Sequence, residues 1–225
     1  MSELNRKAFG GLLKLLLCVV LLIFLPARTL KYWQGWVFIC VFFAAALAIT
    51  LYLMRNDPSL LERRVNAGAA AEKEISQKII QTIAAVVFVG TIVLPVIDHR
   101  FGWSYVPSYA ALTGDGLVML GFFIVFLVFK ENSYTSGIIE VAAEQRVIST
   151  GPYAVVRHPM YAGALILLCG MPLALGSWWG LFTLIPMTMV LVWRLLDEEK
   201  FLTRNLSGYS EYRDRVRYRL APFVW

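Results

Sequence analysis

The chain has few charged residues for its length. Asp, Glu, Lys and Arg make up 16% of its 225 residues, whereas they make up about a quarter of an ordinary soluble domain. The hydrophobic fraction is 59% and the mean hydropathy is +0.65. These values exclude an ordinary soluble domain and predict an integral membrane protein.

Histidine and cysteine are scarce as well. The chain has 2 His and 3 Cys, and it has no Cys-x-x-Cys or His-Glu-x-x-His pattern. We therefore expect no catalytic zinc or iron and no metal site. Cys18, Cys40 and Cys169 are far apart and lie inside apolar runs, so we expect buried packing residues rather than a disulfide framework.

Six apolar segments approach the length of about 20 residues that crosses a membrane. They cover residues 11–25, 33–54, 79–97, 106–129, 160–175 and 178–196. Gly114-Asp-Gly116 is expected to interrupt the fourth segment near its start, and Gly176-Ser177 is expected to turn the last two into a helical hairpin. The predicted fold is an all-α, polytopic transmembrane bundle of about six spans. No sustained small-xxx-small face stands out within a span, so the oligomeric state stays open.

Basic residues are distributed unevenly along this topology. An even number of spans places both termini on one side, and only Arg28, Lys31 and Arg100 of the 21 basic residues fall on the other, which leaves 18. The terminal side is therefore predicted to be cytoplasmic. Orientation in a bilayer explains the net charge of +6 without a nucleic-acid partner. The predicted outer interface carries five tryptophans, Trp33, Trp36, Trp103, Trp178 and Trp179.

Besides the N-terminus, three regions are predicted to face the cytoplasm, residues 55–78, 130–159 and 197–225. The first is either an amphipathic helix on the headgroups or a solvated connector. We expect almost all polar chemistry to come from the other two. The last contains Tyr209 to Arg219, which alternates aromatic and basic residues, and this tail either contacts the membrane or attracts an acidic headgroup or phosphate.

The stretch Gly151-Pro-Tyr-Ala-Val-Val-Arg-His-Pro-Met-Tyr-Ala-Gly163 places polar and turn-forming residues between two spans. Pro159 disfavours helix at the preceding residue, so residues 149–158 should be irregular until a helix begins at Pro159. A helix N-terminus with free N–H groups can hold a carboxylate or phosphate. The alternative is a span begun by proline, with interfacial aromatics and a basic side chain that reaches toward water.

Arg194-Leu-Leu-Asp-Glu-Glu199 follows about thirty residues later, at the other end of the predicted hairpin. Arg194 and Glu198 have the i,i+4 spacing of neighbours on a helix, which is also typical of a local ion pair. Three acids in one turn at a helix C-terminus are unfavourable, and a cationic ligand would relieve this. We expect the two motifs to meet.

Taken together, Gly-Pro-Tyr-x-x-x-Arg-His-Pro-x-Tyr-x-Gly, the hairpin, Arg-x-x-x-Glu-Glu and the Tyr-x-x-Tyr…Arg…Pro-Phe tail resemble the isoprenylcysteine carboxyl methyltransferase family and its phospholipid methyltransferase relatives. The resemblance covers roughly residues 130–225. It implies that residues 130–225 form a cytosolic S-adenosylmethionine pocket, while residues 1–129 supply N-terminal transmembrane helices. It also implies transfer of a methyl group to a lipid-like substrate, most simply a carboxylate of the isoprenylcysteine type.

Residue by residue, the resemblance implies cofactor contacts on an approach strand and in the two motifs. They are Gln145, Arg146, Val147, Ile148, Tyr153, His158, Pro159, Met160, Tyr161 and Glu198. Met160 would contribute only its backbone. Arg194 would orient the substrate as a catalytic residue. For an amine acceptor, Glu199 or His158 would take the proton.

Three alternatives stay open at this point. One is a phosphatidylethanolamine-type N-methyltransferase. Another is an NADPH-dependent sterol reductase, because the C-terminal regions of those membrane enzymes resemble this one, although they are larger. The third is a non-enzymatic channel or scaffold, whose spans should carry polar residues, yet the second, third and sixth segments are nearly uncharged. Partners are expected to be the substrate and membrane lipids.

Overall fold

The computed structural model describes residues 2–72, 74–142 and 145–225, and within these ranges regular structure is helical. The long helices are α1 (Glu3–Ala27), α2 (Trp33–Asn56), α4 (Ile75–Phe101), α5 (Ser108–Glu131), α6 (Pro159–Ala174) and α7 (Leu184–Asn205). Short elements between and after them are α3 (Pro58–Val65), η1 (Ala69–Ala71), η2 (Gly151–Ala154), η3 (Trp179–Thr183) and α8 (Tyr209–Arg215). The predicted all-α, polytopic class is confirmed.

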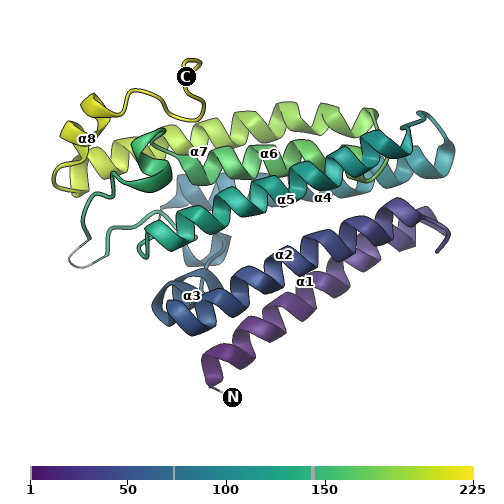
Figure 1. Cartoon of the computed structure of the whole chain (residues 1–225), viewed down its shortest axis with the longest axis horizontal. Helices are drawn as coiled ribbons and strands as arrows, with labels where there is room; N and C mark the ends of the chain where they lie inside the picture. Colours follow the sequence, from purple (N-terminus) through teal and green to yellow (C-terminus); the bar gives the residue numbers. More distant parts are fainter. Residues whose placement is uncertain (1, 73, 143–144) are drawn as a thin grey trace.

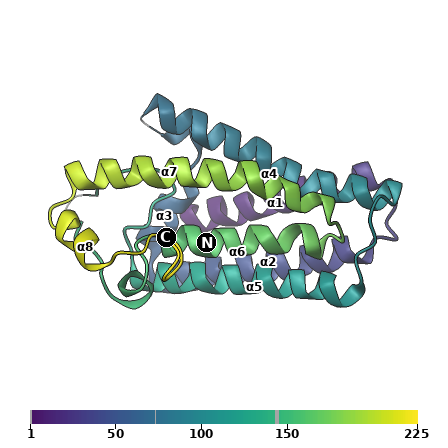
Figure 2. The same ribbon diagram turned by 90° about the horizontal axis from the view of Figure 1, so that it is seen from above.

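The six long helices run along one axis and correspond to the six apolar segments (Figure 1). Five of them, counting η3 with α7, are long and apolar enough to span a membrane. The sixth, α6, has 16 residues and is about 24 Å long at 1.5 Å per residue. Figure 2 shows the whole of α6 within the length of its neighbours. The chain therefore passes six times along the bundle, one of them on a short helix.

The connections sort to the two ends of the bundle (Figures 1 and 2). Residues 28–32, 102–107 and 175–178 connect helices at one end. Toward the other end lie α3, residues 132–142 and 145–158 and the C-terminal tail, and α1 also begins there. The predicted even number of passes is thus present. All five tryptophans of the predicted aromatic belt are exposed.

The closest packing in the bundle joins α5 to α6. A Cβ on Gly114 would lie 2.3 Å from the Ala174 backbone nitrogen, and a Cβ on Gly121 would lie 2.6 Å from the Gly163 carbonyl oxygen. The glycines therefore let the two backbones approach closely. The expected break at Gly114-Asp-Gly116 was wrong, because α5 continues through it and Gly114 serves the contact with α6 instead.

Two other expectations need correction. Cys18 and Cys40 are exposed and Cys169 is only partly buried, so the cysteines are not core residues; they lie on apolar helix surfaces that neighbouring helices do not cover. Residues 145–148 lack strand structure and run without regular hydrogen bonding. By contrast, the helix begins at Pro159 as predicted, after a short 3-10 turn at Gly151–Ala154.

Candidate functional site: a cavity between the two motifs

A cavity of about 580 Å³ lies at the end of the bundle that holds the tail. Its walls come from α4, α6, α7 and α8, from the chain between α5 and α6, and from residues 64–68. The volume falls within the range of small-molecule sites. All ten residues predicted to contact a cofactor line it: Gln145, Arg146, Val147, Ile148, Tyr153, His158, Pro159, Met160, Tyr161 and Glu198. Arg194 lines it too, whereas Glu199 lies outside the lining.

One face of α7 gives the cavity a gradient of polarity. Val190, Arg194, Glu198 and Leu202 are spaced by four residues, and all of them line it. Glu198 and Leu202 lie toward the tail, and Val190 lies deepest in the bundle. Ala84 of α4 and Ala164 of α6 join Val190 at the apolar end. The cavity therefore combines a polar part with an apolar part among the membrane helices.

The three acids of the second motif have different partners. Asp197 accepts a hydrogen bond from Gln77 Nε2 at 3.0 Å and lies 3.7 Å from the Lys200 ammonium. Glu199 pairs with cationic side chains, as described below. Glu198 accepts a hydrogen bond from the Tyr161 hydroxyl at 2.6 Å, a neutral partner. Among the described residues, Glu198 is thus the acid of this turn that faces the cavity without a basic side chain in ion-pair contact.

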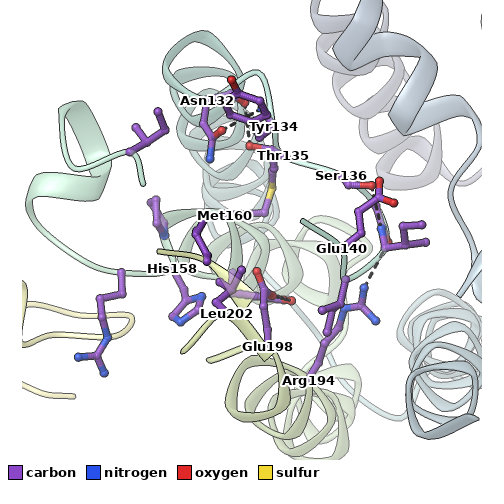
Figure 3. A pocket seen from close by; sticks show the side chains of 18 of the residues that line it. Asn132, Tyr134, Thr135, Ser136, Glu140, His158, Met160, Arg194, Glu198 and Leu202 are labelled. Atoms are coloured by element: carbon purple, nitrogen blue, oxygen red, sulfur yellow. Dashed lines mark hydrogen bonds between the residues drawn. The ribbon is translucent and has the colours of Figure 1, made fainter. Parts of the chain in front are cut away.

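Figure 3 shows the arrangement around Glu198. His158 and Leu202 lie beside it, and Met160 of α6 lies between Glu198 and Thr135, with its sulfur toward Thr135. Asn132, Tyr134 and Thr135 face this group from the opposite wall. The cavity thus brings together side chains of α6, α7 and the chain after α5.

Glu199 is the centre of a buried ion cluster. Its Oε1 lies 2.8 Å from Arg157 Nε and 3.2 Å from His158 Nε2, and its Oε2 accepts a hydrogen bond from Arg219 Nε at 2.9 Å. The side chain of Glu199 is only 8% exposed. This acid therefore ties the first motif and the tail to α7.

The tail also pairs with the first motif through its backbone. The N–H groups of Arg157 and His158 donate to the carbonyls of Tyr218 and Arg219, each at 2.9 Å. These amides are engaged within the chain, so the expectation that residues 149–158 would offer free amides needs correction here. The N–H groups in the first turn of α6, at Met160 and Tyr161, lack helical partners because the helix begins there.

Tyr153 connects the cavity wall to α8. Its hydroxyl accepts a hydrogen bond from Asn132 Nδ2 at 3.1 Å, and its carbonyl accepts one from the Tyr212 hydroxyl at 2.8 Å. Burial raises the pKa of the Tyr153 phenol, so the ring stays neutral. With Leu206, Tyr209 and Val216 it forms a small apolar core under the tail. The tail thus folds onto the cavity.

Arg194 has partners that the sequence did not suggest. It forms an ion pair with Glu72 at 2.8 Å and donates to the side-chain oxygen of Gln77 at 3.0 Å. The spacing also allows a direct ion pair with Glu198, but Arg194 and Glu198 instead both contact the Tyr161 hydroxyl. Residues 55–78 therefore contribute directly to the site, contrary to the expectation that polar chemistry comes almost entirely from the last two regions.

Further lining residues were absent from the predicted set. They include Arg64, Gln81, Asn132, Tyr134, Thr135, Ser136, Gly137, Glu140, Leu202, Leu206, Tyr209 and Tyr212. One signal for the α4 side was present in the sequence: Gln77 and Gln81 place two amides four residues apart where an apolar span begins. Polar side chains at the end of a span are a reason to look for a site.

Comparison with known proteins agrees with this geometry. Residues 109–208 match the phospholipid methyltransferase family. The match runs from α5 through both motifs to the start of α8, and so includes every predicted site residue. The resemblance inferred from the motifs is thereby confirmed for this region.

A second similarity is to a sterol reductase. Mouse Delta(14)-sterol reductase TM7SF2 is 33% identical over 90 residues, which are 39% of this chain. The aligned segment covers only 22% of the reductase. This chain is thus similar to part of a much longer reductase.

Proposed function

We propose that the protein is an S-adenosylmethionine-dependent integral membrane methyltransferase that acts on a lipid-like acceptor. The gradient along α7 carries this proposal: an acid faces the polar part of the cavity, a basic residue lies one turn deeper, and apolar residues follow. The phospholipid methyltransferase match supports methyl transfer. The apolar end between α4, α6 and α7 suits an acceptor with a hydrocarbon chain.

The residues of the cavity suit the proposed cofactor. S-adenosylmethionine, when bound, supplies an electrophilic methyl group together with a cationic sulfonium, an amino group and a carboxylate. Glu198 provides the negative charge that a cationic group requires, since its partner Tyr161 is neutral. The N–H groups of Met160 and Tyr161 are oriented to receive a carboxylate at the N-terminus of α6. Tyr153 and His158 add flat surfaces for an aromatic ring.

Catalysis in such a site is mainly alignment and exclusion of water. Arg194 would orient the acceptor, and Val190 and Leu191 would keep the deep end dry. An acceptor carboxylate of the isoprenylcysteine type needs no base, and a guanidinium can hold it by two parallel hydrogen bonds. Glu199 as a proton acceptor stays a prediction; it is held among Arg157, His158 and Arg219.

An amine acceptor, as in phosphatidylethanolamine, is the second candidate. It is favoured by the pairing of Glu72 with Arg194, which cancels the positive charge near the acceptor end. A reductase that uses NADPH on a sterol is favoured by the partial similarity to TM7SF2. One cavity of about 580 Å³ leaves little room for a dinucleotide together with a sterol.

Methyl tracing tests the proposal and separates the first two candidates. Purified protein would be incubated with S-adenosylmethionine carrying a labelled methyl group and with a membrane lipid extract, and the products identified by mass spectrometry. A labelled lipid that loses its label in mild alkali is an ester, whereas a labelled amine keeps it. A labelled lipid of either kind supports the proposal. If no labelled lipid forms, and the purified protein instead oxidises NADPH in the presence of the same lipid extract, the proposal is contradicted.

A further inference from the structure

Glu72 is a buried acid that lies outside the region matched by the family. It follows η1, just before α4 begins, and its side chain is only 1% exposed. Its Oε1 accepts from Arg194 and from Gln81, and its Oε2 accepts from the backbone N–H of Ile139 at 3.3 Å. Glu72 thus joins α4, α7 and the chain after α5 at one point.

Arg194 is held on several sides by this network. Gln77 accepts from its Nη1 at 3.0 Å, and Glu72 and the Gly137 carbonyl accept from its Nη2 at 2.8 and 3.2 Å. Gln77 in turn donates to Asp197, one turn along α7. These contacts tie the guanidinium to α4 on one side, while on the other side it contacts the Tyr161 hydroxyl, which donates to Glu198.

On α7 itself, Glu198 lines the cavity together with Arg194, whereas Asp197 is bonded to Gln77. Arg194 and Glu198 are four positions apart, which is the spacing of helix ion pairs. If Glu72 were removed, the arginine would be left buried and without its counter-ion. Its long side chain could then rotate toward Glu198 and neutralise the acid that the proposed function assigns to the cofactor.

We propose that Glu72 is a positioning residue that holds Arg194 away from Glu198 and so keeps Glu198 free for a cationic ligand. The inference rests on the proposed function, because it assumes that Glu198 receives the cationic part of S-adenosylmethionine. It assigns a role in the site to a segment that the phospholipid methyltransferase match does not cover.

The test is the affinity for S-adenosylmethionine, measured by calorimetry on the purified full chain in detergent. Glu72→Ala is expected to weaken binding about tenfold, which corresponds to about 1.4 kcal/mol. Arg194→Ala alone is expected to bind normally. The double variant Glu72→Ala/Arg194→Ala is expected to regain the affinity of the wild type, because the competing arginine is gone. Glu74→Ala, an exposed acid two residues away, is the matched control.

The rescue by a second substitution separates positioning from a loss of structure. If the double variant binds as weakly as Glu72→Ala, or if Glu72→Ala binds like the wild type, the inference is wrong while the proposed function stands. A wild type that does not bind S-adenosylmethionine overturns both. Should Glu72→Ala fail to fold, Glu72→Gln retains a hydrogen-bond acceptor and gives the same test, with a smaller loss that Arg194→Ala again relieves.

Discussion

The chemistry of the site depends on how neighbouring carboxylates on α7 are divided among partners. Asp197 and Glu199 have partners inside the protein, and Glu198 faces the cavity beside a neutral tyrosine. Glu198 is partly buried, and a partly buried carboxylate without a basic partner is unfavourable unless a ligand or solvent compensates for it. This division singles out Glu198 among the three as the acid that a cationic ligand can use.

Glu198→Gln tests this assignment at the residue scale. The substitution keeps the size of the side chain and removes its charge, so S-adenosylmethionine binding should weaken at least tenfold, as expected for loss of a charge-assisted contact. Glu211→Gln, an exposed acid on α8, is the control and should bind normally. Equal calorimetric affinity in Glu198→Gln and the wild type would show that the cation is held elsewhere.

Arg194→Ala should separate binding from turnover. Arg194 lies one turn deeper than Glu198, toward the apolar end, so cofactor affinity should be kept while methyl transfer falls by about 100-fold, as for loss of an orienting group. The measurement is label transfer to lipid extract alongside calorimetry. Turnover that is unchanged in Arg194→Ala would remove this residue from the acceptor site.

At the scale of elements, α5 and α6 form the tightest unit, and that unit presents the first motif to the cavity. Gly114 of α5 faces Gly170 of α6, and Gly121 of α5 faces Gly163 of α6. Within each helix the two glycines are seven residues apart. Gly170 and Ala174 have the small-xxx-small spacing, but the pattern is not sustained along α6, so the sequence did not reveal this contact. Packing here fixes where α6 begins, and therefore where Met160 and Tyr161 lie.

Gly114→Ala should destabilise this unit by about 1–3 kcal/mol, the usual cost of overpacking. The added Cβ would meet backbone atoms of α6, the nearest at 2.3 Å, which cannot rotate away. Gly116→Ala is the matched control, because no atom lies within 4 Å of its Cβ. Thermal unfolding in detergent should show a lower midpoint for Gly114→Ala alone. Equal midpoints for both variants would argue against the close packing.

The Glu199 cluster fixes the tail to the site. Glu199→Gln would leave Arg157 and Arg219 without their buried counter-ion, which costs about 3–5 kcal/mol. Hydrogen exchange in residues 209–225 should therefore rise. If exchange stays unchanged while methyl transfer to amines is lost, Glu199 acts as the predicted proton acceptor instead.

At the scale of the whole molecule, the sequence predicted the six passes, the end at which the tail lies and the meeting of the two motifs. Helix ends and motif positions follow from local patterns of proline, charge and hydropathy. The contribution of Glu72 and Gln77 could not be predicted, because their contacts with Arg194 span 122 and 117 residues. Such pairs depend on how α4 packs beside α7, which no local pattern encodes.

The predicted orientation is testable by labelling in whole cells. In a variant in which the three native cysteines are replaced by alanine, Thr29→Cys should react with a membrane-impermeant maleimide from outside. Ser2→Cys and Ser210→Cys should react only after the membrane is opened. The reason is the excess of basic residues on the side of the termini. Labelling of all three positions from outside would contradict this topology.

Calorimetry of the wild type with S-adenosylmethionine and, separately, with NADPH tests the central claim most directly. We expect saturable binding of S-adenosylmethionine, lost in Glu198→Gln, and no response to NADPH. Tight binding of NADPH with no response to S-adenosylmethionine would contradict the claim and would identify the cavity as that of a reductase.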